Sequence, residues 1–424
     1  MFLQYGVPWG AALLVGLVAV WYAQWSTAAY HLFLAAIRGR SWLAFLLTPA
    51  LSALALFLTR RWFAGSEGSG IPQVIAAIHA PPDAARIGRL FGLRVMIGKI
   101  ALSLLGLLGG LSIGREGPTV HLGAAIMVET RRFYPRWTPR LERQLLLAGA
   151  AAGLSGAFNT PLAGIVFAIE EIARDFENRT NGIMITAVVF SGLTSLALAG
   201  NYLYFGQINV SHGFHADFAL PVLVAALVCG LLGAAFNLAL LHWEVWMPRP
   251  LQTWRTTRPM TYALGLGLAI AALGVATHGD TWGSGYDQAR GLLDATAPAS
   301  PAFAITKWAS MIMSYMVGIP GGLFSPSLSV GAGLAEWVHA AFHWAPMPAL
   351  IALCMTGYLA AVTQSPITAF VIVMEMTNGS GLVIPMMATG LIAARIAGLF
   401  TPPLYEALAH KNYFPKPAPA HPVA

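Results

Sequence analysis

The stretch Gly114-Arg115-Glu116-Gly117-Pro118 places an acidic residue inside a glycine-rich turn with strongly apolar runs on both sides. Its proline suits the first turn of a helix, where the missing N–H has no helical partner. Its glycines leave main-chain amides open to a ligand. Free N–H groups and the helix dipole both favour negative charge at a helix start. The stretch therefore predicts an anion-binding helix N-terminus with Glu116 at its mouth.

Two further stretches repeat this pattern of glycines followed by a proline and an apolar helix. One is Gly68-Ser69-Gly70-Ile71-Pro72, and the other is Gly321-Gly322-Leu323-Phe324-Ser325-Pro326. Three helix N-termini that point into a membrane interior would make one anion site. We expect the three stretches to meet in the folded protein.

Composition sets the class of protein. The 424 residues are 57% hydrophobic and 10% charged, and the mean hydropathy is +0.66. Soluble domains have about 25% charged residues, so the chain is predicted to be an all-α, multi-pass membrane protein. Some of its roughly ten apolar segments are too long for one simple span, which predicts tilted or broken helices. The segments are 8–37, 42–59, 95–113, 145–170, 183–200, 217–241, 261–277, 302–317, 346–374 and 381–400.

The remaining composition argues against other site types. The net charge of +7 comes from arginines in short loops, which is typical of cytoplasmic membrane loops rather than of nucleic-acid binding. Met1–Gly10 lack a basic region, so the first apolar run is expected to stay as a membrane helix. Cys229 and Cys354 are expected to be packed thiols. The closest histidines, His212 and His215, have no acidic or thiol partner nearby, so we expect neither a metal site nor a cofactor.

The chain also repeats itself. Ala157–Glu170 and Val362–Glu375 both have an amide, a hydroxyl and a proline, then an apolar helix and a glutamate; the offset is 205 residues. Gly68-Ser69-Gly70 has an echo at Gly283-Ser284-Gly285. We therefore expect two related halves, 1–212 and 213–424, with inverted topology and the substrate site between them. A short disordered tail is expected from about 411.

Several polar residues in apolar surroundings are candidates for function. A carboxylate at membrane depth normally marks a pathway, although Glu116 could instead form an ion pair with Arg115. Glu171 aligns with Met376 in the repeat, so the fold needs no acid there; it could pass protons to Glu116 or be a charged helix end near Arg174. Lys99 could reach the membrane surface or add positive potential near an anion path.

Taken together, the motifs resemble those of the CLC family of chloride channels and chloride/proton antiporters. The matches are the three glycine-rich stretches, the segment Ala151–Glu171 and Pro403-Leu404-Tyr405, in family order across nearly the whole chain. The resemblance implies a fold of two inverted-topology repeats. It also implies a homodimer with one pathway per subunit. The compact chain resembles prokaryotic members without CBS domains, which implies the bacterial inner membrane.

The resemblance also implies a role for individual residues. Ser69 and Tyr405 correspond to side chains that coordinate the central anion; read alone, they would be a helix cap and an interfacial aromatic residue. Gly117, Leu323 and Phe324 would supply main-chain amides. Glu116 matches the external gating glutamate, and Glu171 matches the internal proton-transfer glutamate. Serine in the first stretch resembles chloride-preferring members, and the other two stretches differ from the fluoride-exporting branch.

These features favour a secondary active antiporter that exchanges chloride for protons across the lipid bilayer. A passive chloride channel of the same fold is the alternative, with Glu116 as its gate and no proton driven. A membrane-embedded enzyme is not expected, because the sequence offers no clustered metal site, nucleophile–base pair or further phosphate loop.

Overall fold

The computed structural model describes residues 6–79, 84–174, 182–200, 203–208, 218–296 and 300–414. Within them the only extended pairings are two isolated bridges, Gly68 with Pro320 and Gly114 with Gly322. The predicted all-α fold is thus confirmed. The helices are α1 (Val7–Ile37), α2 (Ala44–Trp62), α3 (Ile71–His79), α4 (Ala84–Phe91), α5 (Leu93–Leu108), α6 (Glu116–Glu129), α7 (Pro139–Phe158), α8 (Pro161–Phe167), α9 (Gly182–Ala199), α10 (Ala219–Trp246), α11 (Arg249–Thr257), α12 (Pro259–Ala276), α13 (Tyr286–Leu293), α14 (Phe303–Met316), α15 (Phe324–Ala341), α16 (Met347–Thr363), α17 (Pro366–Thr377), α18 (Val383–Gly398) and α19 (Leu404–Tyr413). Short 3-10 or π turns add η2 (Ser41–Leu43), η3 (Thr130–Phe133), η4 (Ala168–Ala173) and η6 (Ser380–Leu382).

Seven helical segments among the described residues are long and apolar enough to cross a membrane, which confirms a multi-pass membrane protein. Many of their outward side chains are large and apolar, as lipid contact requires. The seven segments are Val7–Ile37, Ser41–Trp62, Ile87–Leu108, Gly182–Ala199, Ala219–Trp246, Pro259–Ala276 and Ser380–Gly398.

Two of the overlong apolar segments are broken helices, as expected. The segment 145–170 breaks between α7 and α8, and 346–374 breaks between α16 and α17. The residues that end the first helix of each pair, Asn159 and Gln364, both have the left-handed conformation at φ 57°. A proline follows two residues later in each case and cannot continue the preceding helix. The sequence pattern amide–hydroxyl–proline is therefore the cause of both breaks.

The two broken pairs cap each other. The Glu375 carboxylate, near the end of α17, accepts hydrogen bonds from the first amides of α8, at Leu162 (3.2 Å) and Ala163 (2.7 Å). The Glu170 carboxylate, in η4, accepts them from the first amides of α17, at Ile367 (3.1 Å) and Thr368 (2.6 Å). Helix-start amides have no partner within their own helix, so each glutamate satisfies the opposite helix.

Small residues bring the inner helices close together. A side chain at Gly123 of α6 would run into the main chain of Gly149 in α7, and one at Gly331 of α15 would run into the main chain of Cys354 in α16. Van der Waals packing of this kind holds helices together inside a membrane. The hydrophobic effect does not drive their association there, because the lipid tails are as apolar as the side chains. The pairs α6–α7 and α15–α16 therefore form the rigid frame behind the glycine-rich turns.

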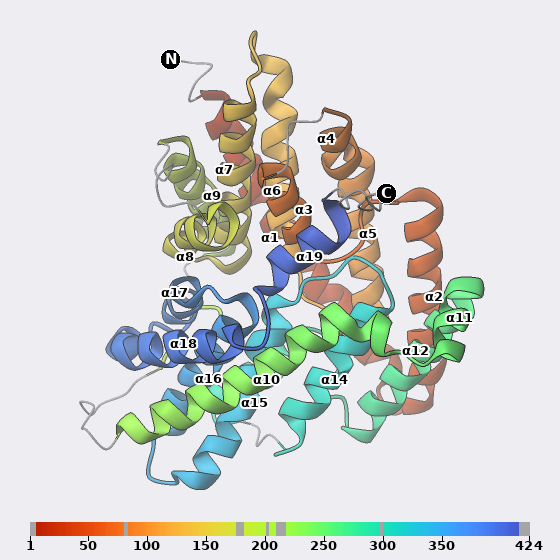
Figure 1. The fold of residues 1–424 in the computed structure, drawn as a ribbon, viewed down its shortest axis with the longest axis vertical. Helices are drawn as coiled ribbons and strands as arrows, with labels where there is room; N and C mark the ends of the chain where they lie inside the picture. Colours follow the sequence, from red (N-terminus) through yellow and green to blue (C-terminus); the bar gives the residue numbers. More distant parts are fainter. Residues whose placement is uncertain are drawn as a thin grey trace, which may run out of the picture.

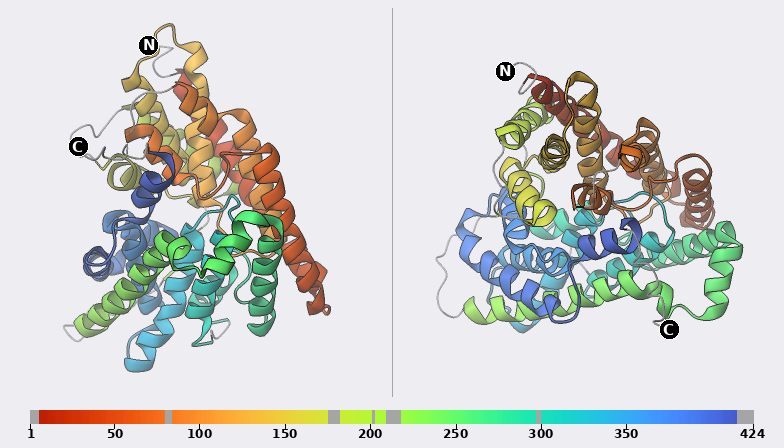
Figure 2. Two further views of the ribbon diagram at one scale, coloured as in Figure 1. Left: turned by 45° about the vertical axis from the view of Figure 1, so that its right-hand side comes forward. Right: turned by 45° about the horizontal axis from the view of Figure 1, so that its top comes forward.

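The first and second parts of the chain occupy different regions (Figure 1). Helices α3 to α9 lie mainly in the upper part of that view, and α10 and α14 to α18 lie in the lower part. Helix α8 packs against α17 where these regions meet, and α2 runs beside α12. Helix α19, the last in the chain, returns to pack against α3, and the turned views show it on the same side of the molecule as α3 (Figure 2). This return brings Tyr405 to the first glycine-rich turn.

Two predicted features lie partly outside the described residues. His212 and His215 lie outside them, and so do residues 415–424 of the predicted tail. The described chain stays helical beyond position 411, because α19 continues to Tyr413. Lys411 explains this extension: its ammonium group donates to the Leu241 carbonyl (2.9 Å) and pairs with Glu244 (3.1 Å), both on α10.

The reciprocal caps give a stability prediction. Glu375→Ala removes the acceptor of two helix-start amides, and we expect it to lower the free energy of unfolding by about 1–2 kcal/mol. Thermal unfolding in detergent, followed by circular dichroism, measures the change. Asp294→Ala is the control, because its surface ion pair with Arg290 is mostly solvated and contributes little. Equal melting temperatures for both variants would contradict the capping role.

Candidate functional site

Main-chain hydrogen bonds hold the three glycine-rich turns together. Gly114 and Gly322 exchange two of them, each 2.7 Å long, and Gly68 exchanges two with residues 319 and 321, each 3.2 Å long. A side chain at Gly322 would lie 3.0 Å from the Gly114 carbonyl oxygen and 3.1 Å from the Gly117 nitrogen, so this close approach favours glycine. Consequently α3, α6 and α15 begin at one place, as the sequence predicts.

The predicted anion ligands gather at this junction. Ser69 is buried, and its hydroxyl oxygen has no hydrogen-bond partner among the described residues. Gly117 lies directly against that hydroxyl, because an added Cβ would overlap it. Tyr405 is buried beside Ser69, and its ring stacks on Phe324 with 5.8 Å between centroids. Leu323 is the buried residue that precedes Phe324 at the start of α15.

Glu116 is the first residue of α6, and its side chain is completely buried. The Ser325 hydroxyl donates to Glu116 Oε1 at 2.6 Å, and the Tyr204 hydroxyl donates to the same oxygen at 3.4 Å. The nearest guanidinium nitrogen of Arg115 is 3.9 Å away, and that guanidinium donates instead to the Ala23 carbonyl of α1 at 2.7 Å. Hydroxyl groups therefore hold this carboxylate more closely than its charged neighbour does.

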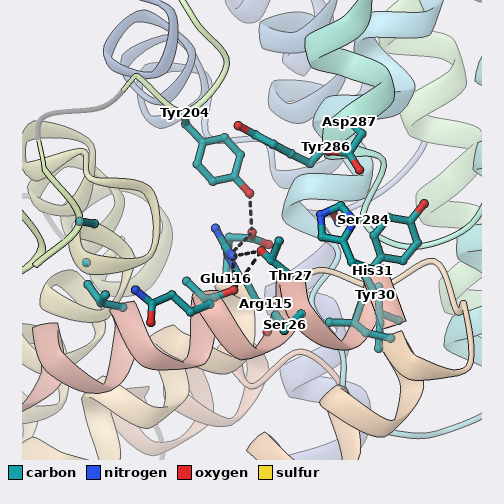
Figure 3. Close-up of a pocket in the computed structure, with 18 residues that line it drawn as sticks. Ser26, Thr27, Tyr30, His31, Arg115, Glu116, Tyr204, Ser284, Tyr286 and Asp287 are labelled. Atoms are coloured by element: carbon teal, nitrogen blue, oxygen red, sulfur yellow. Dashed lines mark hydrogen bonds and ion pairs between the residues drawn. The ribbon is translucent and has the colours of Figure 1, made fainter. Parts of the chain in front are cut away.

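A cavity of about 560 Å³ reaches Glu116 from one side of the molecule (Figure 3). Residues of α1, of the Arg115 turn and of α13 line it, together with Tyr204. The close-up places the Tyr204 hydroxyl above Glu116, with His31 and Asp287 to the right of this pair in the view. This cavity is the access route to Glu116 from that side.

Glu171 lies in the π turn η4 and is also completely buried. The Ser365 hydroxyl, at the start of α17, donates to its Oε2. Arg174 is 3.9 Å from its Oε1, but the same guanidinium makes a 2.5 Å hydrogen-bonded ion pair with Glu406. Glu171 therefore lies at a helix end near Arg174, as one of the two interpretations has it, but its side chain is buried and accepts a hydrogen bond from the Ser365 hydroxyl.

Sequence comparison places the chain in a family. The family described as "Voltage gated chloride channel" matches residues 51–398, which is most of the chain and includes four of the five motifs. The chain belongs to the CLC family. The resemblance to the CLC family that the motifs indicated is thereby confirmed.

Curated relatives support this assignment. The chain is 31% identical over 391 residues to "H(+)/Cl(-) exchange transporter ClcA" of Yersinia pestis bv. Antiqua (strain Angola), covering 86% of this chain and 77% of the relative. It is 30% identical over 421 residues to the transporter of the same name in Cronobacter sakazakii (strain ATCC BAA-894), covering 93% and 87%. Both relatives are bacterial, in line with the predicted bacterial membrane.

Solved structures share the fold. A slow cyanobacterial Cl-/H+ antiporter superposes with a TM-score of 0.78 at 23% identity, covering 96% of this chain and 97% of that one. A CLC-type fluoride/proton antiporter superposes with a TM-score of 0.80 at 20% identity and the same coverage. The predicted CLC fold is thus confirmed.

Lys99 corrects one sequence expectation for this CLC protein. Its side chain is completely buried, so it does not reach the membrane surface. Its ammonium group lies 3.3 Å from the Glu67 carbonyl and 3.2 Å from the Gly68 carbonyl, at the start of the first glycine-rich turn. Lys307, which sequence reasoning missed, binds the Gly283 carbonyl at 2.7 Å at the start of the echo of that turn. Each lysine thus supports one Gly-Ser-Gly turn.

Sequence reasoning also missed Tyr204 and Ser325, the two hydroxyl donors to Glu116. Ser325 lies inside the third glycine-rich stretch, so its polar side chain next to Phe324 was an available signal. Tyr204 gave no such signal, because it lies in a connection between helices, 88 residues from Glu116.

The two cysteines are free and buried, as predicted. They are neighbours in the fold, with the Cys229 thiol 3.4 Å from the Cys354 carbonyl oxygen. Within the described residues no cluster of three or more histidine, cysteine, aspartate or glutamate side chains could hold a metal ion.

Proposed function

We propose that this CLC protein is a chloride/proton antiporter in which Glu116 is the external gate and proton carrier. The observation that carries the proposal is that two fully buried acids, Glu116 and Glu171, occur in one chain together with the buried hydroxyls of Ser69 and Tyr405. Glu116 and Glu171 both lie close enough to the Tyr405 hydroxyl to act on it electrostatically, and Ser69 adjoins that hydroxyl. Two buried acids near a hydroxyl-lined centre fit coupled exchange. The curated relatives, which are named as H(+)/Cl(-) exchange transporters, support it.

In the proposed mechanism, chloride binds at the junction of the glycine-rich turns. The hydroxyls of Ser69 and Tyr405 replace part of its hydration shell. The first amides of α6 and α15, at Gly117, Leu323 and Phe324, supply the rest, because helix-start N–H groups have no intrahelical partner. Neutral donors bind a small anion strongly enough to dehydrate it and weakly enough to release it.

Glu116 links this anion to a proton. The start of α6 carries a partial positive charge that attracts chloride, and an ionised Glu116 carboxylate can take the place of chloride there. When Glu116 takes a proton, that attraction is lost and chloride can replace the side chain. The protonated group then exchanges its proton with the cavity on one side or with the path toward Glu171 on the other. The start of α6 therefore cannot bind chloride and the Glu116 carboxylate at the same time. This mutual exclusion couples chloride movement to proton movement.

We infer that residues 1–212 and 213–424 are two related halves of inverted topology. The reciprocal caps of Glu170 and Glu375, the paired breaks at Asn159 and Gln364, and the two lysine-supported turns support this division. We also propose a homodimer with one pathway per subunit. Outward apolar side chains of α9 and α18, such as Leu193 and Ile384, offer a surface for a second copy.

The first test measures chloride and proton movement together. Purified protein is reconstituted into chloride-loaded liposomes, and a potassium ionophore releases the membrane potential. Proton uptake driven by chloride efflux, with no imposed pH gradient, is the expected result. Chloride efflux without any pH change would overturn antiport and leave a passive chloride channel.

Replacing the proposed gate, Glu116, should uncouple chloride movement from proton movement. Glu116→Gln cannot ionise, so we expect proton uptake to fall to the background of empty liposomes while chloride efflux continues. Glu129→Gln, at the other end of the same helix and partly exposed, is the control and should keep both fluxes. Retained proton uptake in Glu116→Gln would contradict the gating role.

Replacing the second acid should affect protons more than chloride. Glu171→Gln keeps the shape of the side chain and removes its proton exchange, for which positioned acids contribute roughly 10²-fold or more. We expect proton uptake to fall by about that factor and chloride efflux to change far less. The same liposome assay measures both, and equal losses of both fluxes would mean that Glu171 is structural.

The junction itself gives a binding prediction. Gly117→Ala pushes a methyl group into the Ser69 hydroxyl, and we expect chloride affinity to fall by about tenfold or more, which corresponds to roughly 1.4 kcal/mol. Calorimetric titration with chloride measures this in detergent. Gly10→Ala is the matched control, because nothing lies within 4 Å of its added Cβ. Unchanged affinity in Gly117→Ala would place the anion elsewhere.

A further inference from the structure

Two hydroxyl groups form a small cluster with the Glu116 carboxylate. Ser325 Oγ is 2.6 Å from Glu116 Oε1, Tyr204 Oη is 3.4 Å from the same atom, and the two hydroxyls are 3.4 Å apart. All three side chains are at most 3% exposed. Glu116 Oε2 has no hydrogen-bond partner among the described residues. One carboxylate oxygen is therefore held by two donors while the other is left bare.

Tyr204 is fixed in this position by its surroundings. Its ring meets Tyr286 of α13 edge-on at 4.8 Å and Phe158 of α7 edge-on at 5.4 Å. The next residue, Phe205, donates its main-chain N–H to Met376 of α17 at 3.1 Å. The ring also lies 5.6 Å from the Arg115 guanidinium carbon. A tyrosine held from three helices directs its hydroxyl at Glu116 rather than merely filling space (Figure 3).

We propose that Tyr204 and Ser325 are positioning residues that hold the ionised Glu116 carboxylate in its closed position. The proposal deepens the gating role of Glu116 and rests on that proposed function. An ionised carboxylate only accepts hydrogen bonds, so both hydroxyl groups can donate to it. A protonated Glu116 can carry its hydrogen on the bare Oε2 and draws less on the two donors. Proton binding thus weakens the hold that keeps the gate closed.

The other groups that face Glu116 stay constant in the test. Arg115 approaches from its own turn, Tyr22 from α1 and Tyr405 from α19. His31 of α1 and Asp287 of α13 line the cavity above it. None of these groups is changed by Tyr204→Phe or Ser325→Ala, which each remove a single hydroxyl group. A difference between variants therefore reports the hydroxyl cluster.

The experiment records chloride efflux from liposomes as a function of external pH. Without a donor the ionised carboxylate is less stable, so a proton releases Glu116 in less acidic solution. We expect the efflux–pH curve to move to higher pH by roughly one unit in Tyr204→Phe and in Ser325→Ala, with greater efflux near neutral pH. Ser325→Thr keeps a hydroxyl and should keep the original curve.

Two matched controls test the position of the hydroxyl. Tyr262→Phe removes a buried tyrosine hydroxyl of α12 that has no hydrogen-bond partner among the described residues. Ser329→Ala removes a hydroxyl of the same helix, α15, that donates to Gly285. Both should keep the curve of the unchanged protein. In a Glu116→Gln background, Tyr204→Phe and Ser325→Ala should produce no further shift, because no ionised carboxylate remains to be held.

The outcomes separate this proposal from the proposed function. If Glu116→Gln abolishes coupling but Tyr204→Phe and Ser325→Ala leave the curve in place, the hydroxyl cluster does not hold the gate. If the shifts persist in the Glu116→Gln background, the hydroxyls act through another group and the proposal is overturned. If Glu116→Gln itself leaves coupling intact, the proposed gating function fails first.

Discussion

The mutual hydrogen bonds between Gly114 and Gly322 are the constraint on which the rest of this structure depends. Main-chain N–H and C=O groups at membrane depth must find partners inside the protein. Three turns in one place would leave many such groups without partners. The glycine pair and the Gly68 contacts let the turns satisfy one another, and the absence of a side chain at Gly322 favours this close approach. The free amides that remain are those at the helix starts, where an anion or a carboxylate is favoured.

Two structural features then occur in both parts of the chain: helix caps formed by a glutamate, and turns supported by a lysine. Glu170 and Glu375 cap each other's neighbouring helices, and Lys99 and Lys307 each bind carbonyls at the start of a Gly-Ser-Gly turn. The asymmetry is equally informative. Glu171 has only Met376 as its counterpart, and Glu116 has only Leu323 or Phe324 in the third stretch. The framework is duplicated, whereas the fully buried acids of the described chain, Glu116 and Glu171, both lie in the first part. We therefore assign function to these acids rather than to the scaffold.

Local chemistry explains what the sequence could predict. Prolines and glycines act within a few residues, so the helix starts at 71, 116 and 324 and the breaks near Asn159 and Gln364 could be read from the chain. Burial depends on distant elements, and Lys99 shows the consequence. A lysine in an apolar run can reach the surface or find carbonyl partners, and only the fold decides between these outcomes. Tyr204 escaped notice for the same reason, since the packing of α7, α13 and α17 alone brings its hydroxyl to Glu116.

The two buried acids are held in the same manner across the boundary between the two parts of the chain. The Ser325 hydroxyl at the start of α15 donates to Glu116, and the Ser365 hydroxyl at the start of α17 donates to Glu171. Both serines belong to the second part, and both acids belong to the first. Hydrogen bonds to an ionised acceptor are stronger than those to its neutral form. A proton that moves from one acid to the other would therefore weaken one contact between the two parts and restore another. Such an exchange leaves the number of strong contacts between the two parts unchanged.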